Sequence, residues 1–225
     1  MRWEVADLGI LVVFRHKNKI IRSKVVLLQA KRLYSTRTTV ETNPLNDRLG
    51  FNDMFIGDEH WKELSKPQTF TFADRSRYKA LEIADNQYEA IEKYERRHKI
   101  PVHYLFYNPP TIPMEMEFPI TTPESEVDVK LGCRVLPSKR LREMIKKRNQ
   151  EVPPSFANLK SHLGSPFDDA ENIGGWRLET YIVEHLLACK DGLIDTSPKC
   201  EHLGHIFSQK QRPINAAITI TMEMP

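Results

Sequence analysis

The chain has 225 residues, which is enough for one large domain or for a core with a small appendage. Its 33 Lys and Arg residues against 30 Asp and Glu residues leave a net charge of +3, so nucleic-acid binding requires local clustering of basic side chains rather than an overall basic surface. Three cysteines are too few for a disulfide scaffold, and no apolar run approaches the roughly 20 residues that span a bilayer. We therefore expect a cytoplasmic protein with no membrane partner.

The N-terminal region predicts a β-hairpin. Residues 8–14 (LGILVVF) form an apolar, β-branched run that is typical of a buried strand. Residues 16–19 are a polar turn, and a second strand runs from Ile20 through residues 24–32 (KVVLLQAKR). Strand-like sequence begins by residue 8, so we expect that a longer parent chain supplies an N-terminal helix before it.

The middle of the chain predicts an irregular region, a helix and a strand. Residues 35–75 are polar with scattered aromatic side chains, and a short helix is expected near residues 60–64. An amphipathic helix is expected over residues 76–97, and its apolar positions are Ala84, Tyr88, Ile91 and Tyr94. Pro101 ends this helix, and residues 102–107 (VHYLFY) form a strand that stops at Asn108-Pro-Pro.

The C-terminal half predicts a further mixture of loops, strands and helices. The expected elements are a proline-rich loop at 111–126, a strand at 127–136, a basic helix at 138–148, a loop at 149–175, a helix at 177–188 and an edge strand at 216–224. This order predicts an α/β fold with a mixed central sheet flanked by helices. Residues 1–110 would form the core, and residues 111–225 a continuation of the same domain or a C-terminal extension.

Three polar residues are expected to meet on the predicted hairpin. Gln29 and Lys31 are two apart in a strand and therefore project from the same face, while Leu28 and Ala30 face the other way. Asp7 lies at the entrance to the first strand, and neighbouring strands are only about 4.8 Å apart, so the hairpin can bring Asp7 beside Gln29. A carboxylate, an amide oxygen and an ammonium group would then gather at one end of two paired strands.

Asp7, the hairpin and Gln29-Ala-Lys31 resemble the PD-(D/E)XK nuclease superfamily, and more narrowly its Mrr-like branch, which carries glutamine in place of the acidic residue. In that family a helix and another strand follow, as expected here at 84–94 and 102–107. The resemblance covers about half the chain, from residue 4 to residue 107. No proline precedes Asp7, and the helix before the aspartate, which in the family often carries a glutamate, is absent or reduced to residues 2–5. The resemblance implies a restriction-endonuclease-like fold.

The resemblance also implies a reaction, the hydrolysis of phosphodiester bonds in DNA, in restriction or phage defence. Asp7, Gln29 and Lys31 would be the catalytic residues, with Mg²⁺ or Mn²⁺ held by Asp7, by the side-chain oxygen of Gln29 and by the carbonyl of Ala30. Glu4 would add a second carboxylate if it reaches the site. Lys31 would orient the attacking water and stabilise the pentacovalent phosphorus.

Two other interpretations stay open. A nuclease-fold module without catalysis would bind nucleic acid or a partner protein, which the neutral Gln29 and the reduced front helix favour. A structural or interaction protein, alone or as a homo-oligomer, would carry Gln29 and Lys31 as exposed strand residues. Retention of DNA without cleavage distinguishes the first of these from the nuclease.

Further candidate residues have a weaker pattern. Gln87 is expected to be an exposed helix residue, although the resemblance implies a polar residue from this helix near the site. Cys189, Cys200, His202 and His205 are residue types that bind zinc, but the tight Cys-x2–4-Cys spacing of structural zinc sites is missing. Candidate phosphate contacts are the basic runs Lys139-Arg140-Leu-Arg142, Lys146-Lys147-Arg148 and Arg96-Arg97-His98.

Overall fold

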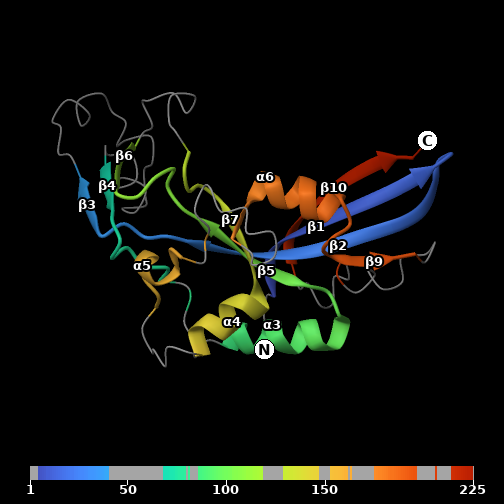
Figure 1. The fold of residues 1–225 in the computed structure, drawn as a ribbon, viewed down its shortest axis with the longest axis horizontal. Coiled ribbons are helices and arrows are strands. Elements are labelled where there is room, and N and C mark those ends of the chain that lie inside the picture. The colour runs from blue at the N-terminus through green and yellow to red at the C-terminus, as the bar shows by residue number, and fades with distance from the viewer. Residues whose placement is uncertain are drawn as a thin grey trace, which may run out of the picture.

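The computed structural model describes residues 5–40, 68–79, 81, 86–118, 129–146, 153–161, 163, 175–196, 206 and 214–224. Two sheets organise these residues (Figure 1). The larger sheet has seven strands in the order β10-β1-β2-β5-β7-β8, with β9 paired to β2. The smaller sheet has three strands in the order β3-β4-β6.

The predicted hairpin is confirmed, and it forms the centre of the larger sheet. Strands β1 (Ala6–His16) and β2 (Lys19–Arg32) pair antiparallel from Leu8↔Leu28 to His16↔Lys19. The two turn residues, Lys17 and Asn18, have φ values of 49° and 64°. Two consecutive left-handed residues give the type I′ turn whose twist matches that of paired strands. Strand β1 begins at Ala6, so Asp7 lies within the strand and not before it.

The larger sheet is mixed, because strands from both halves of the chain join it. Strand β5 (Val102–Tyr107) lies parallel to β2, and β7 (Arg134–Pro137) lies antiparallel to β5. Short strands β8 (Trp176–Arg177) and β9 (Leu193–Asp195) pair antiparallel with β7 and β2. The tenth strand, β10 (Ile214–Glu223), lies parallel to β1 and forms the edge strand that its alternating sequence predicts. The fold is therefore mixed α/β, and residues beyond 110 continue the sheet of the hairpin.

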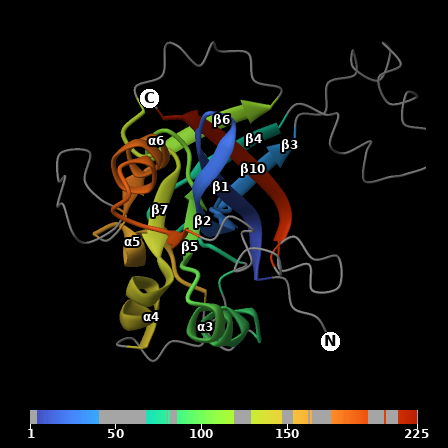
Figure 2. The ribbon, with the colours of Figure 1, turned by 90° about the vertical axis from the view of Figure 1, so that its right-hand side faces the viewer.

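Helices cover both faces of this sheet (Figures 1 and 2). Helices α3 (Asn86–His98) and α4 (Ser138–Lys146) lie on one face, where Ile91, Tyr94 and Leu141 join a core with Val25 and Leu27 of β2. The short helix α6 (Leu178–Thr180) and the π-helix η3 (Tyr181–Leu187) lie on the other face. There, Tyr181 and Leu186 pack against residues of β1 and β2 such as Val12 and Leu28. Alternate residues of β2 thus serve two separate apolar layers.

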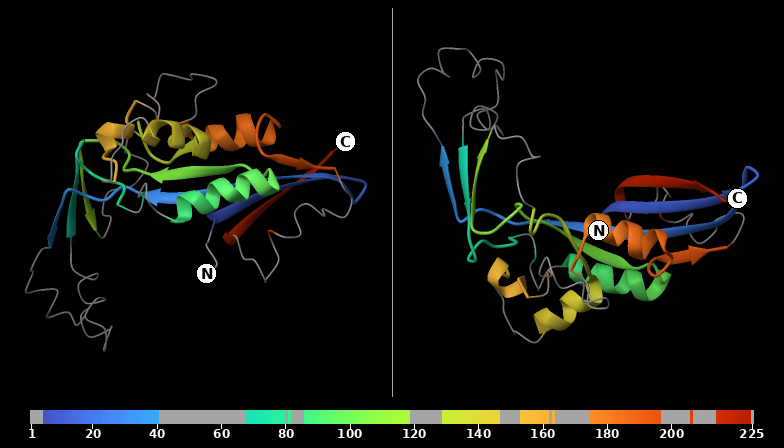
Figure 3. Two further views of the ribbon diagram at one scale, coloured as in Figure 1. Left: turned by 90° about the horizontal axis from the view of Figure 1, so that it is seen from below. Right: turned by 45° about the horizontal axis from the view of Figure 1, so that its top comes forward.

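The smaller sheet overturns two predicted loops. Strands β3 (Arg37–Val40) and β4 (Gln68–Phe72) fall within residues 35–75, and β6 (Met114–Phe118) falls within 111–126. The sequence MEMEF of β6 alternates with the period of a strand, and Phe70 pairs with Met116 in the antiparallel register. This sheet lies at the end of the molecule away from the tip of the β1–β2 hairpin (Figure 3). The short helix expected near residues 60–64 lies outside the described residues.

The predicted first residues of two elements are wrong, because backbone hydrogen bonds to other segments hold these residues in loops. The helix expected from residue 76 is absent at 76–79, where the amide of Tyr78 donates to Pro154 and the amide of Phe156 donates to Ser76. Of the strand expected over residues 127–136, residues 129–133 lie outside a strand, because their turn donates two amides to the carbonyl of Pro110, and β7 begins at Arg134. Residues 127 and 128 lie outside the described residues.

Three further elements differ from expectation in extent or type. The basic helix expected at 138–148 is described as α4 (Ser138–Lys146). A short helix, α5 (Phe156–Leu159), lies within the loop expected at 149–175, and Ser155 caps it. The helix expected at 177–188 is confirmed at this position, where α6 and η3 follow one another, but most of it is π-helix. Among the described helices, none has the length and apolar character needed to cross a membrane.

Candidate active site

Asp7 and Gln29 are joined directly across β1 and β2. The Nε2 atom of Gln29 donates to Oδ2 of Asp7 at 2.6 Å. The backbone amide of Ala30 donates to the same oxygen, also at 2.6 Å. Two donors on one carboxylate oxygen fix the position of Asp7 at the start of β1, because hydrogen bonds to an ionised acceptor are short and strong.

Gln87, in the first turn of α3, extends this contact to Lys31. Its Nε2 atom donates to Oε1 of Gln29 at 3.0 Å, and its Oε1 atom accepts from Nζ of Lys31 at 2.8 Å. Gln29 and Lys31 are buried, with 4% and 5% of their surfaces exposed. The expectation that Gln87 is an exposed helix residue is therefore wrong: it is half-buried and contacts both β2 residues. Exposure of Gln29 and Lys31, which the interaction-protein interpretation requires, is also wrong.

We refer to Asp7, Gln29, Gln87 and Lys31 as the polar quartet. Its hydrogen bonds all run in one direction, from the ammonium group of Lys31 through two amides to the carboxylate of Asp7. Each amide accepts on the side of the positive charge and donates on the side of the negative charge, so the bonds polarise one another. The quartet therefore holds one positive and one negative group in a fixed arrangement, in which Lys31 and Gln29 are buried and Asp7 and Gln87 are half-buried.

The local fold explains why these side chains meet. Gln29 and Lys31 occupy the same strand face as Val25 and Leu27, which pack in the core covered by α3. Strand β5 continues directly from α3 and pairs parallel with β2, with Gln29 level with Tyr104. Helix α3, which precedes β5, therefore packs over the C-terminal end of β2, and Gln87 in its first turn contacts Lys31.

The oxygen atoms of Asp7, Gln29 and the neighbouring Ala30 have the composition of a weak magnesium site. Asp7 offers a carboxylate, Gln29 an amide oxygen and Ala30 a backbone carbonyl, and Mg²⁺ prefers oxygen ligands while keeping several waters. In the observed orientation the amide nitrogen of Gln29 faces Asp7, so metal binding requires the amide to turn and present its oxygen. No group of three or more Asp, Glu, His or Cys side chains suited to a metal occurs in the described part of the chain. Glu4, the expected second carboxylate, lies outside the described residues.

The structure describes only some of the candidate zinc ligands and candidate phosphate contacts. Cys189 is half-buried and donates to the carbonyl of Leu187 at 3.6 Å, whereas Cys200, His202 and His205 lie outside the described residues. Arg96, Arg97 and Lys139 are exposed on α3 and α4, as phosphate contacts require. Arg142 is instead paired to Glu95 at 2.8 Å within the structure. Residues 147 and 148 are not described.

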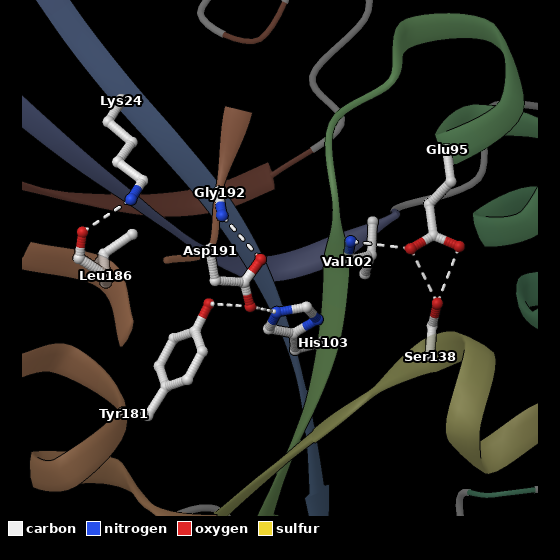
Figure 4. Close-up of polar contacts among 9 residues, drawn as sticks. All are labelled: Lys24, Glu95, Val102, His103, Ser138, Tyr181, Leu186, Asp191 and Gly192. Atoms are coloured by element: carbon white, nitrogen blue, oxygen red, sulfur yellow. Dashed lines mark hydrogen bonds and ion pairs between the residues drawn. The ribbon is translucent and has the colours of Figure 1, made fainter. Parts of the chain in front are cut away.

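A second polar cluster, which sequence reasoning missed, lies on the opposite face of the sheet (Figure 4). The carboxylate of Asp191 accepts from the amide of Gly192 at 2.6 Å and from Tyr181 at 3.2 Å, and it contacts Nε2 of His103 at 2.5 Å. Burial alone would raise the pKa of Asp191, but the hydrogen bond and charge of His103 lower it to about 2. The only signal in the sequence is the Asp-Gly pair, which is typical of a turn.

Lys24 is fully buried beside this cluster. Its ammonium group donates to the carbonyl of Leu186 at 2.8 Å, near the end of the π-helix η3 (Figure 4). Burial lowers the pKa of Lys24, although the charges of Cys189 and Asp191 oppose this shift. The hydrogen bond ties β2 to the helix that covers it, so we assign Lys24 a structural role.

No family model, curated protein or solved structure matches this chain.

Proposed function

We propose that the protein is a metal-dependent nuclease of the PD-(D/E)XK type, with the polar quartet as its active site. The observation that carries this proposal is the continuous hydrogen-bonded series from Lys31 to Asp7. A buried lysine linked through two amides to a carboxylate at the ends of two strands suits phosphodiester hydrolysis better than it suits a sheet whose only task is packing. The resemblance of the Gln29-Ala-Lys31 sequence extends the proposal to DNA as substrate and to a restriction-endonuclease-like fold.

Each residue has a role that its position supports. Asp7 would be the charged ligand of a divalent cation, and the oxygens of Gln29 and Ala30 the neutral ligands. A bound Mg²⁺ or Mn²⁺ supplies charge stabilisation at the phosphate and lowers the pKa of a water. Lys31 would orient the attacking water and stabilise the negative charge on phosphorus as the bond to the leaving oxygen breaks. Gln87 would position Lys31, because it holds the ammonium group from the helix side.

The proposal is tested by incubating the protein with plasmid DNA and Mg²⁺ or Mn²⁺, with and without EDTA. Lys31→Met keeps most of the buried side-chain volume but removes the ammonium group, so loss of metal-dependent nicking in this variant supports the nuclease. Lys93→Ala is the matched control, because Lys93 is an exposed lysine of α3. Absence of any metal-dependent cleavage by the wild-type protein would contradict the proposal.

A second candidate function is a nuclease-fold module that binds nucleic acid or a partner protein without cleaving a substrate. It is favoured by the amide nitrogen of Gln29 facing Asp7, which makes the pair complete without a metal. Retention of DNA without cleavage, unchanged by Lys31→Met, supports nucleic-acid binding. Metal-dependent cleavage by the wild-type protein that is lost in Lys31→Met would contradict this candidate and support the nuclease.

A further inference from the structure

Strand β10 forms one margin of the larger sheet and is long and exposed there (Figure 2). Within the described ranges it pairs with β1 alone, and most of its ten residues are exposed. Ile218, near its middle, has 51% of its surface exposed. The outward side of such a strand offers amide and carbonyl groups that can pair with another strand.

Nothing in β10 itself protects this margin. Residues 214–222 contain no charged residue and no proline. The pairing with β1 runs from Ala6↔Ile214 to Arg15↔Glu223 without a shift, so no bulge turns the strand away. The opposite margin is protected by its shortness, since β8 has only two residues. Proteins that stay monomeric usually place a charge, a proline or a bulge on an edge as long as β10.

The sequence of β10 is complementary to itself in the antiparallel direction. A two-fold axis at Ile218, the midpoint of residues 214–222, places Ala216 opposite Ile220 on the face where Ile220 packs. Ile214, which falls level with Met222, packs instead against the core on the other face of the sheet. On the other face the axis places Ala217 opposite Thr219 and Asn215 opposite Thr221. Apolar residues therefore meet apolar residues, and small or polar residues meet each other, which is the pairing that stabilises neighbouring strands.

The apolar face of this pairing continues an existing core. Ile220 and Met222 already pack at the margin of the cluster that contains Val12, Phe14 and Leu186. A second β10 would extend this layer across the axis, so the main-chain hydrogen bonds would be accompanied by burial of apolar surface. A two-fold contact of this kind uses the same surface on both partners and closes at two chains.

We propose that β10 is a dimerisation edge that pairs antiparallel with β10 of a second copy of this chain, joining the two large sheets into one. In the parallel register, Asp7 is level with Asn215, three residues from the axis. With about 3.3 Å per residue along a strand and about 4.8 Å between strands, the two Asp7 positions lie about 25 Å apart on one face of the joined sheet. The dimer does not depend on the proposed function, because it rests on β10 alone.

The test is the mass in solution of the full chain, measured by sedimentation velocity over a concentration series. The wild-type protein is expected to form dimers, and Ile218→Lys is expected to be monomeric because it places two ammonium groups opposite each other. Ile21→Lys is the matched control: Ile21 has 46% of its surface exposed and lies on β2, away from the margin, so this variant stays dimeric. Circular dichroism checks that each variant is folded.

A monomeric wild-type protein across the series, or a dimer that persists in folded Ile218→Lys, overturns the proposal. The register is tested by oxidising Ile218→Cys and Glu223→Cys beside the wild-type protein, whose own cysteines provide the background. Cysteines at position 218 face each other across the axis and are expected to crosslink, since opposed Cβ atoms lie about 5 Å apart. Crosslinking at 223 in place of 218 contradicts this pairing.

Discussion

The side-chain oxygen of Gln87 accepts a hydrogen bond from the ammonium group of Lys31 at 2.8 Å, across 56 residues of sequence. This contact joins the first turn of α3 to β2 at the point where the apolar run of the strand ends. It turns the two residues of a Gln-x-Lys element into a four-residue site with an opposite charge at each end.

Gln29→Glu is expected to make stability depend on divalent metal. The new carboxylate would lie against Asp7, where the present contact is 2.6 Å, so like-charge repulsion would lower the melting temperature at neutral pH without metal. A cation between the two carboxylates would remove this repulsion. The melting temperature of the variant should therefore rise with Mg²⁺ or Mn²⁺ by more than that of the wild-type protein, as measured by calorimetry. An equal response of the two proteins would argue against a metal position beside Asp7.

Gln87→Leu is expected to lower the free energy of unfolding by about 1–3 kcal/mol, because it removes a partner from the buried Lys31 and another from Gln29. Chemical denaturation measures the loss. If the quartet is catalytic, this variant should also lose activity while still binding DNA, because Lys31 loses the contact that holds its ammonium group from the side of α3. Glu92→Gln, on the same helix, provides the comparison. A Gln87→Leu protein as stable as the wild type would show that the quartet is not held together as the structure indicates.

Glu95→Ala is expected to be among the more destabilising changes on α3. The carboxylate accepts hydrogen bonds from the amide of Val102 and the hydroxyl of Ser138 (Figure 4). It also accepts one from the guanidinium group of Arg142, so it joins α3 to β5 and α4. Hydrogen bonds to a charged group contribute about 1.5–3 kcal/mol each. Because Glu95→Ala leaves three donors without this partner, the free energy of unfolding should fall by at least the contribution of one such bond.

Glu89→Ala is the control for Glu95→Ala. Glu89 and Lys93 form an exposed ion pair on the same helix, with 68% and 67% of their side-chain surfaces accessible to solvent. Exposed pairs of this spacing contribute about 0.3–0.5 kcal/mol. Denaturant midpoints of the two variants should therefore differ clearly, and similar midpoints would contradict the structural role of Glu95.

Asp191 is expected to control stability in acid. Its pKa is lowered from 3.8 to about 2, so its contribution is fully present above pH 4 and is lost as the pH falls toward 2. The difference corresponds to about 2.5 kcal/mol, since one pKa unit corresponds to about 1.4 kcal/mol. Asp191→Asn should therefore be less stable than the wild type at neutral pH, and the difference should shrink below pH 4. Melting temperatures across this range measure it, and a constant difference would contradict the lowered pKa of Asp191.

Local sequence determined the hairpin, β5, the place of the helix before it and the shared face of Gln29 and Lys31. These features depend on the two-residue period of a strand, on turn residues that accept positive φ, and on the apolar stripe of a helix, all of which are read within a few residues. The same local reasoning placed Asp7 next to Gln29, because a hairpin fixes which residues face each other once its turn is known.

Only the tertiary structure decided the rest. The position of Gln87 depends on how α3 is laid over β2, and the smaller sheet depends on pairing between strands that are far apart in the sequence. The polar cluster at Asp191 similarly joins residues from β5, η3 and the turn before β9. Such contacts become favourable only after distant segments have been brought together and their polar groups must find partners away from water, which no local pattern records.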